Sequence, residues 1–204
     1  MTTETQTERP IEFSKAEVIA YAEGIGLHRT HESMTRNVQH VYGWIEREKS
    51  DAMHLLKDHL KGKMVVDVHC GRPEQFKFIA DFVRRCGASG YNGVDDHLLP
   101  QAAERQITFS DDFILFYSDL ALRHLANMPD RYGPVCINGV SSTTYPNYPL
   151  FLTQEIARVA GKNIVFGFGS SEVFSELRKR DFKDILDPKL AGLGFSFGIL
   201  KREE

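Results

Sequence analysis

Four acidic side chains stand at or near the ends of apolar runs, where a carboxylate can serve a polar ligand. They are Asp67, Asp95, Asp96 and Asp119. A carboxylate at the end of a strand can accept two hydrogen bonds from the diol of a ribose. Asp95 follows Gly71 at a separation close to the roughly 20 residues that dinucleotide-binding folds use for this purpose. The same acids also suit turns and helix starts, so Asp119 could either accept from an adenine amino group or cap a helix.

The turn at 67–73 is the second candidate for ligand contact. Gly71 would let a ligand approach the backbone closely, and the helix expected to begin at Pro73 offers unpaired N–H groups. A plain strand-to-helix turn explains the same residues, and Pro73 removes one of those N–H groups. The sequence has no Gly-x-Gly-x-x-Gly, which argues against a nicotinamide or flavin dinucleotide.

Strands and helices alternate from about residue 62 to the C-terminus, and these elements must position the acids. The apolar runs predict strands at 64–68, 91–94, 113–117, 134–140 and 163–168, and a last strand or hairpin arm at 194–200. Helical spacing predicts helices at about 73–86, 98–105, 120–127, 152–160 and 171–180. This order predicts an α/β fold, a Rossmann-like and mostly parallel sheet of seven strands with helices on both faces. Ligands bind such sheets at the carboxyl ends of the strands, where the acids lie.

Residues 11–61 are expected to form an N-terminal helical segment. Ser14 and Glu17 fit a capping box before a first helix that ends near Gly24. Apolar spacing predicts a second helix from about Thr30 and a third over 51–60.

The composition predicts one globular domain. The chain has 204 residues, 42% apolar and 26% charged, so a sizeable core is available. We expect a disordered tail at 1–10 and a single domain at 11–204, with a helical cover at 11–61 and an α/β core at 62–204. The formal net charge of -3 without a basic stripe argues against a nucleic-acid partner. No apolar stretch is long enough to suggest a membrane span.

The cysteines indicate a reducing compartment. Cys70, Cys86 and Cys136 are widely spaced among apolar neighbours, which predicts buried thiols, and no two have the spacing of a zinc pair. The polar N-terminus lacks the cationic start and apolar run of a signal peptide. We therefore expect a cytoplasmic protein without a metal site.

The order of these segments resembles the class I methyltransferases that use S-adenosylmethionine (SAM). The resemblance rests on Met64–Gly71, on Gly90–Asp96 with Ala102–Arg105 after it, and on Phe113–Asp119. In that family the first motif is an apolar run followed by Asp-x-Gly-x-Gly-x-Gly, and the second strand ends in Gly-Val-Asp or Gly-Ile-Asp. The later segments Ile156–Phe166 and Gly194–Arg202 resemble the family's fifth strand with its helix and its last hairpin strand.

The resemblance implies a role for each acid in binding the cofactor. Asp67 matches the acid that helps hold the amino-acid end of SAM, and Gly71 matches a glycine of the same motif. Asp95, with Asp96 beside it, matches the ribose-binding acid, and Asp119 matches the acid beside the adenine.

Two residues depart from the first motif. His69 stands at its first glycine and Pro73 at its last, and both could narrow the approach of the cofactor. One interpretation is that the loop has adapted, so that His69 belongs to the cofactor site with its ring turned away from the ligand. The other is that the site is lost and the domain serves as a binding scaffold.

The residues that would serve the methyl acceptor are less defined. A hydroxyl acceptor usually needs a general base, most often His or a carboxylate. Helices before the sheet often cover the substrate in this family, so His31 and His40 are candidates, although exposure on a helix is the commoner fate of histidine. Asn138 lies at the end of the fourth strand, where the family often places a polar group that faces the substrate. Tyr145, in the polar segment that follows, is the last candidate, and that segment equally suits a surface loop.

Together these patterns predict a SAM-dependent methyltransferase that acts on oxygen or nitrogen of a small-molecule acceptor. The alternative is a catalytically inactive methyltransferase-like domain that serves as a binding or assembly partner. A nucleotide-binding enzyme of another doubly wound family would need a phosphate loop, which the sequence lacks. The acceptor and the oligomeric state, a homo-oligomer included, do not follow from the sequence.

Overall fold

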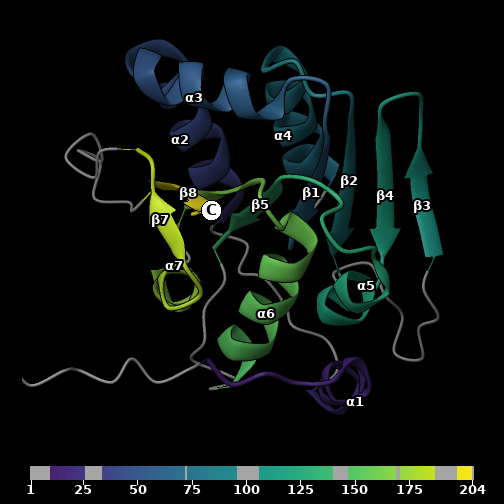
Figure 1. The fold of residues 1–204 in the computed structure, drawn as a ribbon. Coiled ribbons are helices and arrows are strands. Elements are labelled where there is room, and N and C mark those ends of the chain that lie inside the picture. The colour runs from purple at the N-terminus through teal and green to yellow at the C-terminus, as the bar shows by residue number, and fades with distance from the viewer. Residues whose placement is uncertain are drawn as a thin grey trace, which may run out of the picture.

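One mixed sheet forms the centre of this computed structural model, which describes residues 10–25, 34–71, 73–95, 106–139, 147–168, 171–186 and 197–203. Within these ranges it has eight strands in the order β3-β4-β2-β1-β5-β6-β8-β7 (Figure 1). The strands are β1 (Met64–Val68), β2 (Gly90–Asp95), β3 (Gln106–Ser110), β4 (Ile114–Ser118), β5 (Val135–Asn138), β6 (Ile164–Phe168), β7 (Phe182–Asp184) and β8 (Phe197–Arg202).

The sheet confirms the predicted α/β class but not its strand count. The pairs β4–β2, β2–β1, β1–β5 and β5–β6 are parallel. The antiparallel strand β8 lies between β6 and β7, and the antiparallel strand β3 adds an eighth strand at the edge beside β4. Strand β3 is a short alternating stretch with a bulge between Ile107 and Phe109, so its sequence lacks the continuous apolar run of the inner strands. The helix predicted at 98–105 lies outside the described residues.

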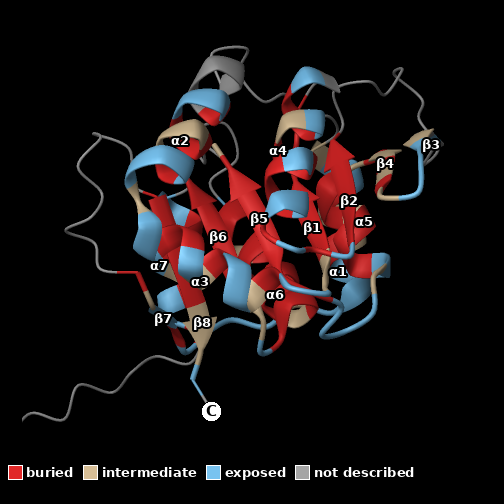
Figure 2. Cartoon of the chain, turned by 90° about the horizontal axis from the view of Figure 1, so that it is seen from above, coloured by how far each residue is buried: buried red, intermediate tan, exposed pale blue. Residues whose placement is uncertain are grey.

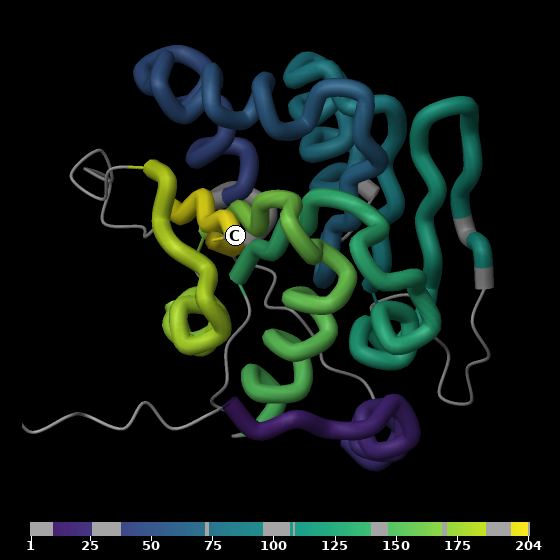
Figure 3. The backbone as a smooth tube through the Cα atoms, viewed as in Figure 1, coloured from purple at the N-terminus to yellow at the C-terminus, as the bar shows by residue number. Residues whose placement is uncertain are grey.

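Helices cover both faces of the sheet (Figure 1). One face carries α2 (Met34–Glu48), α3 (Ser50–Leu60) and α4 (Pro73–Arg85), and the other carries α1 (Lys15–Ile25), α5 (Ala121–Asn127), α6 (Tyr148–Ala160) and α7 (Ser171–Arg178). The N-terminal helices are therefore divided between the two faces, as the trace in Figure 3 shows for α1 against α2 and α3. Figure 2 shows that the inner strands β1, β2, β5 and β6 are buried between these two layers.

The alternation of side chains along the strands decides which face each site residue joins. Val66 and Val68 of β1 belong to the core under α5 and α6, whereas Val65 belongs to the core under α2 and α4. Asp67 has the same parity as Val65, so its side chain lies on the α2–α4 side. The parity of Asp95 in β2 places it on that same side, with Tyr91.

The first helix begins as its sequence predicts. The backbone N–H of Ser14 donates to Oε2 of Glu17 at 2.7 Å, and the N–H of Glu17 donates to the Ser14 hydroxyl oxygen at 3.3 Å. This capping box is confirmed, and the hydrogen bonds to Ser14 lower the pKa of Glu17. Phe151 of α6 stacks between Phe13 and Tyr21, with ring centroids 4.0 and 4.1 Å away. These contacts fix α1 on the face opposite α2.

The three cysteines are buried and unbridged, as predicted. Burial raises the pKa of each thiol, that of Cys86 to about 11. Among the described residues, no helix is both long and apolar enough to cross a membrane.

Candidate functional site

The loop after β1 meets the end of β2 through one hydrogen bond. The backbone N–H of Gly71 donates to Oδ2 of the fully buried Asp95 at 2.8 Å. Gly71 has φ 78°, and a Cβ at this position would lie 1.7 Å from Oε1 of Gln75. The positive φ favours glycine at position 71, and a Cβ there would also require the end of the Gln75 side chain to move aside. The glycine and the acid that the sequence singled out lie together at the carboxyl edge of the sheet.

Asp67 lies beneath this loop with no exposed surface. The hydroxyl of Tyr91 donates to its Oδ2 at 2.5 Å. The pKa of Asp67 is raised to about 7, mainly by burial and to a smaller extent by the charge of Asp95, while hydrogen bonds with Tyr91 and Cys136 oppose the rise. The sequence did not predict the hydrogen bond from Tyr91 to Asp67, because an aromatic residue in a strand is typical of a hydrophobic core.

His69 takes the backbone conformation of a glycine although it carries a side chain. Its φ is 58°, in the left-handed region that His tolerates better than most non-glycine residues. The ring is only 3% exposed, and its Nε2 lies 2.5 Å from the hydroxyl of Tyr148, the first residue of α6. The imidazole thus connects the loop after β1 to the helix that follows the loop after β5.

Asn138 ends β5 within a buried polar cluster. Tyr42 of α2 donates its hydroxyl to Oδ1 of Asn138 at 3.0 Å, and Nδ2 of Asn138 lies 3.2 Å from Sγ of Cys136. Burial raises the pKa of Tyr42 well above its usual value, so the hydroxyl stays protonated. Asn138 is held on the side of the sheet that also carries Asp67 and Asp95.

A small hollow of about 10 Å³ lies among these groups. It is lined by Val38, His69, Cys70, Gly71, Gln75, Ile79 and Asn138. A volume of this size holds about one water molecule. The hollow therefore marks where α2, α4 and the ends of β1 and β5 converge, and side chains fill most of the space between them.

Asp119 is engaged in local contacts at the start of α5. It is fully buried, and its Oδ1 accepts from the backbone N–H of Leu120 at 2.8 Å and from Nε of Arg123 at 2.7 Å. Its own N–H donates to the backbone oxygen of Asp95 at 3.2 Å. The N-cap of α5 is Leu120, and it makes no side-chain cap hydrogen bond, so the interpretation of Asp119 as the helix cap is wrong. The backbone contact places Asp119 next to Asp95 at the carboxyl edge.

Of the remaining candidates from the sequence, His40 alone lies within the described residues. His40 is exposed on α2 and does not line the hollow. His31, Asp96 and Tyr145 lie outside the described residues. In the part of the chain that the structure describes, no group of three or more His, Cys, Asp or Glu side chains could hold a metal ion.

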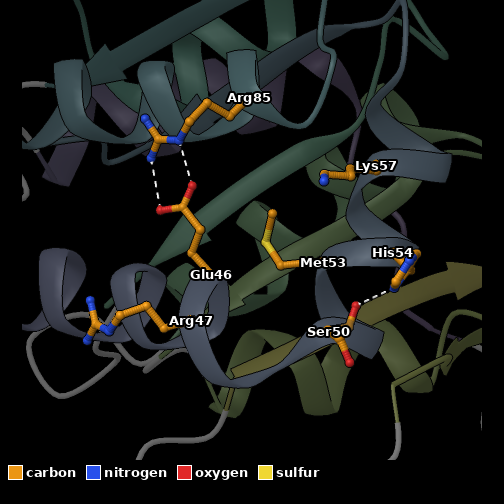
Figure 4. Close-up of a pocket in the computed structure, with 7 residues that line it drawn as sticks. All are labelled: Glu46, Arg47, Ser50, Met53, His54, Lys57 and Arg85. Carbon is orange, nitrogen blue, oxygen red and sulfur yellow. Dashed lines mark hydrogen bonds and ion pairs between the residues drawn. The ribbon is translucent and has the colours of Figure 1, made fainter.

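A larger pocket of about 370 Å³ lies between α2, α3 and α4 (Figure 4). Arg85 pairs with Glu46 there through two hydrogen bonds of 2.6 and 3.2 Å, and Lys57 and Met53 lie beside that pair. Arg85 ends α4, and the chain then enters β2 from its amino end. The pocket is therefore far from the carboxyl edge where α/β sheets bind ligands.

Comparison with known proteins identifies the fold through solved structures. No protein-family model matches the sequence, and no curated protein matches it. The magnesium protoporphyrin IX methyltransferase of Synechocystis PCC 6803 with bound SAM superposes with a TM-score of 0.50 at 14% identity, covering 97% of this chain and 88% of that chain. The same enzyme with bound SAH (S-adenosylhomocysteine) gives a TM-score of 0.50 at 12% identity, covering 92% and 94%. At these identities the likeness shows a shared fold.

Proposed function

We propose that this chain, which has the fold of the class I methyltransferases, is a SAM-dependent methyltransferase. The observation that carries the proposal is the contact between the Gly71 N–H and the Asp95 carboxylate. It joins the loop after β1 to the acid that ends β2, and the resemblance places its first two motifs at these positions. The fold neighbour with bound SAM supports the choice of cofactor.

The carboxylates at the carboxyl edge of the sheet can accept hydrogen bonds from the polar groups of SAM. Asp95 uses one oxygen for Gly71, and a carboxylate can accept several hydrogen bonds, so a ribose diol could bind it as well. Asp67 offers a buried carboxyl whose Oδ1 has no hydrogen-bond partner among the described residues. Gly71 carries no side chain, and the end of the Gln75 side chain fills the space where its Cβ would lie. We assign Asp67, His69, Gly71, Asp95, Asp96 and Asp119 to the cofactor site.

We further propose that the acceptor is an oxygen or nitrogen atom of a small molecule. SAM supplies the methyl group, and the protein's part is to bind both reactants in line and, for a hydroxyl, to take its proton. The net charge of -3 supports a metabolite rather than nucleic acid. His31, His40, Asn138 and Tyr145 are the acceptor-side candidates, and among the described residues Asn138 is the one that lines the hollow.

One observation favours the alternative of a catalytically inactive binding domain. The hollow beside Gly71 measures only about 10 Å³, because His69 and Gln75 fill space next to the glycine loop. An active cofactor site requires these side chains to rearrange when the ligand enters.

Calorimetry with SAM and SAH separates the two functions. A methyltransferase should bind both ligands with dissociation constants in the micromolar range, and Asp95→Ala should weaken both. A chain that binds neither at millimolar concentration is the inactive domain. Transfer of a labelled methyl group from SAM to a metabolite mixture then tests catalysis directly.

A further inference from the structure

One polar side chain lies in the apolar face that α4 packs against the sheet. It is Gln75, which is 6% exposed. In the part of α4 whose side chains the structure describes, the other buried residues are all apolar: Phe76, Ile79, Ala80, Phe82 and Val83. A buried carboxamide costs free energy unless it makes hydrogen bonds, so packing against the sheet does not by itself favour glutamine at this position.

The end of this side chain fills the space over Gly71. A Cβ on Gly71 would lie 1.7 Å from Oε1 and 2.6 Å from Cδ of Gln75. Gln75 is the third residue of α4, and helical side chains lean toward the start of their helix, which brings its carboxamide back over the loop after β1. A ligand group that approaches Gly71 from this side therefore meets the Gln75 carboxamide first.

Gln75 can leave this space more easily than His69, the other side chain beside Gly71. The ring of His69 has its Nε2 2.5 Å from the Tyr148 hydroxyl, which ties it to α6. Gln75 is unbranched, so rotation about its side-chain bonds can move the carboxamide from Gly71 without a shift of the backbone. That rotation would open the surface of the loop next to Asp95, whose Oδ2 accepts from the Gly71 N–H.

We propose that Gln75 is a gate on the cofactor site, and this inference rests on the proposed function. The carboxamide occupies the surface of Gly71 that SAM would take, and SAM binds after this side chain has rotated away. The apparent dissociation constant of a ligand rises as the fraction of molecules in the binding-competent arrangement falls. Gln75 therefore weakens the binding of SAM and SAH by the same factor, because the two ligands share their ribose and their amino-acid end.

The test is calorimetry of SAM and SAH with the wild type and with Gln75→Ala. The variant should bind both ligands about tenfold more tightly, the size expected when a buried, hydrogen-bonded side chain no longer has to be displaced. A glutamine that only stabilises the start of α4 makes a different prediction. Its replacement would lower the melting temperature and bring no gain in affinity.

Gln154→Ala is the matched control for the loss of a buried glutamine. Gln154 lies on α6, is 8% exposed and exchanges hydrogen bonds of 2.6 Å with the backbone of Phe13, on the face of the sheet opposite α4. Its replacement should lower the melting temperature and leave the affinity for SAM unchanged. A gain in affinity in Gln75→Ala that also appears in Gln154→Ala would overturn the gate.

The wild type allows a second measurement in case Gln75→Ala does not fold. The side-chain amide resonance of Gln75 should move to the position of an exposed glutamine when SAM saturates the protein. A resonance that stays in place at saturation would overturn the inference, as would equal or weaker binding by Gln75→Ala. If neither the wild type nor Gln75→Ala binds SAM or SAH, the proposed function fails, and this result differs from a failure of the gate alone, in which both proteins bind.

Discussion

The carboxylate of Asp95 accepts the backbone N–H of Gly71 at 2.8 Å, with both residues buried. One side chain at the end of β2 therefore holds the loop that follows β1. The acid that we assign to the ribose also shapes the loop over which the rest of the cofactor would lie. Substitutions at Gly71 or Asp95 should therefore change both the affinity for the ligand and the stability of the fold, and the two effects can be measured separately.

Replacing Asp95 with alanine should weaken the binding of SAM and SAH by roughly tenfold to a hundredfold, because hydrogen bonds to a charged acceptor contribute about 1.5–3 kcal/mol each. It should also lower the melting temperature, since the Gly71 N–H loses its acceptor. Asp95→Asn is the matched control, because it keeps an oxygen that can accept from Gly71 while losing the charge. Calorimetry and thermal unfolding of both variants decide the point, and unchanged affinity with a lowered melting temperature would limit Asp95 to a structural role.

Gly71→Ala should destabilise the fold by about 1–3 kcal/mol, because a non-glycine residue at φ 78° is strained and its Cβ would collide with the Gln75 carboxamide. Urea unfolding measures the effect. Adding Gln75→Ala should recover the part due to the collision and leave the part due to the backbone. A double variant no more stable than Gly71→Ala would show that Gln75 moves aside without cost.

Asp67 should make the stability of the protein depend on pH. Burial raises its pKa in the folded state to about 7, above the usual value of 3.8, so the folded protein binds this proton more tightly than the unfolded chain does. Its contribution to the free energy of unfolding is therefore fully present below about pH 4 and is lost as the pH rises through 7. The measurement is urea unfolding of wild type and Asp67→Asn from pH 4.5 to 8. The free energy of unfolding of the wild type should fall relative to that of the variant as the pH rises. A difference that is constant over this range would contradict the raised pKa.

Asp119→Ala should act mainly on stability. The carboxylate is buried and accepts from Arg123 and from the N–H of Leu120, so its loss removes the nearer of the two acidic partners of Arg123 and the acceptor of the Leu120 N–H. A cost of about 1–3 kcal/mol is expected in chemical unfolding. Cofactor affinity should fall less than in Asp95→Ala. A larger loss of affinity at Asp119 than at Asp95 would make Asp119 the principal nucleoside contact.

Local sequence patterns were enough to predict the parts of the structure that depend on neighbours in the chain. The capping box at Ser14 and Glu17 and the buried strands β1, β2 and β6 follow from spacing within a few residues. The position of Asp67 and Asp95 at or near strand ends follows from the same patterns, because parallel strands joined by crossover helices bring their carboxyl ends to one edge.

Tertiary structure alone decided how the helices are shared between the faces and what the site residues touch. Tyr148 reaches His69 across 79 residues of sequence, and Tyr42 reaches Asn138 across 96. Hydrogen bonds of this kind leave no periodic pattern, since a single tyrosine in an apolar stretch is equally typical of a core. The left-handed φ of His69 has no signal in its own residue type, and the sequence points to it only through the resemblance, which places a glycine of the first motif at this position. The sequence therefore determined which strand ends carry polar groups, and packing across the sheet determined which of those groups meet.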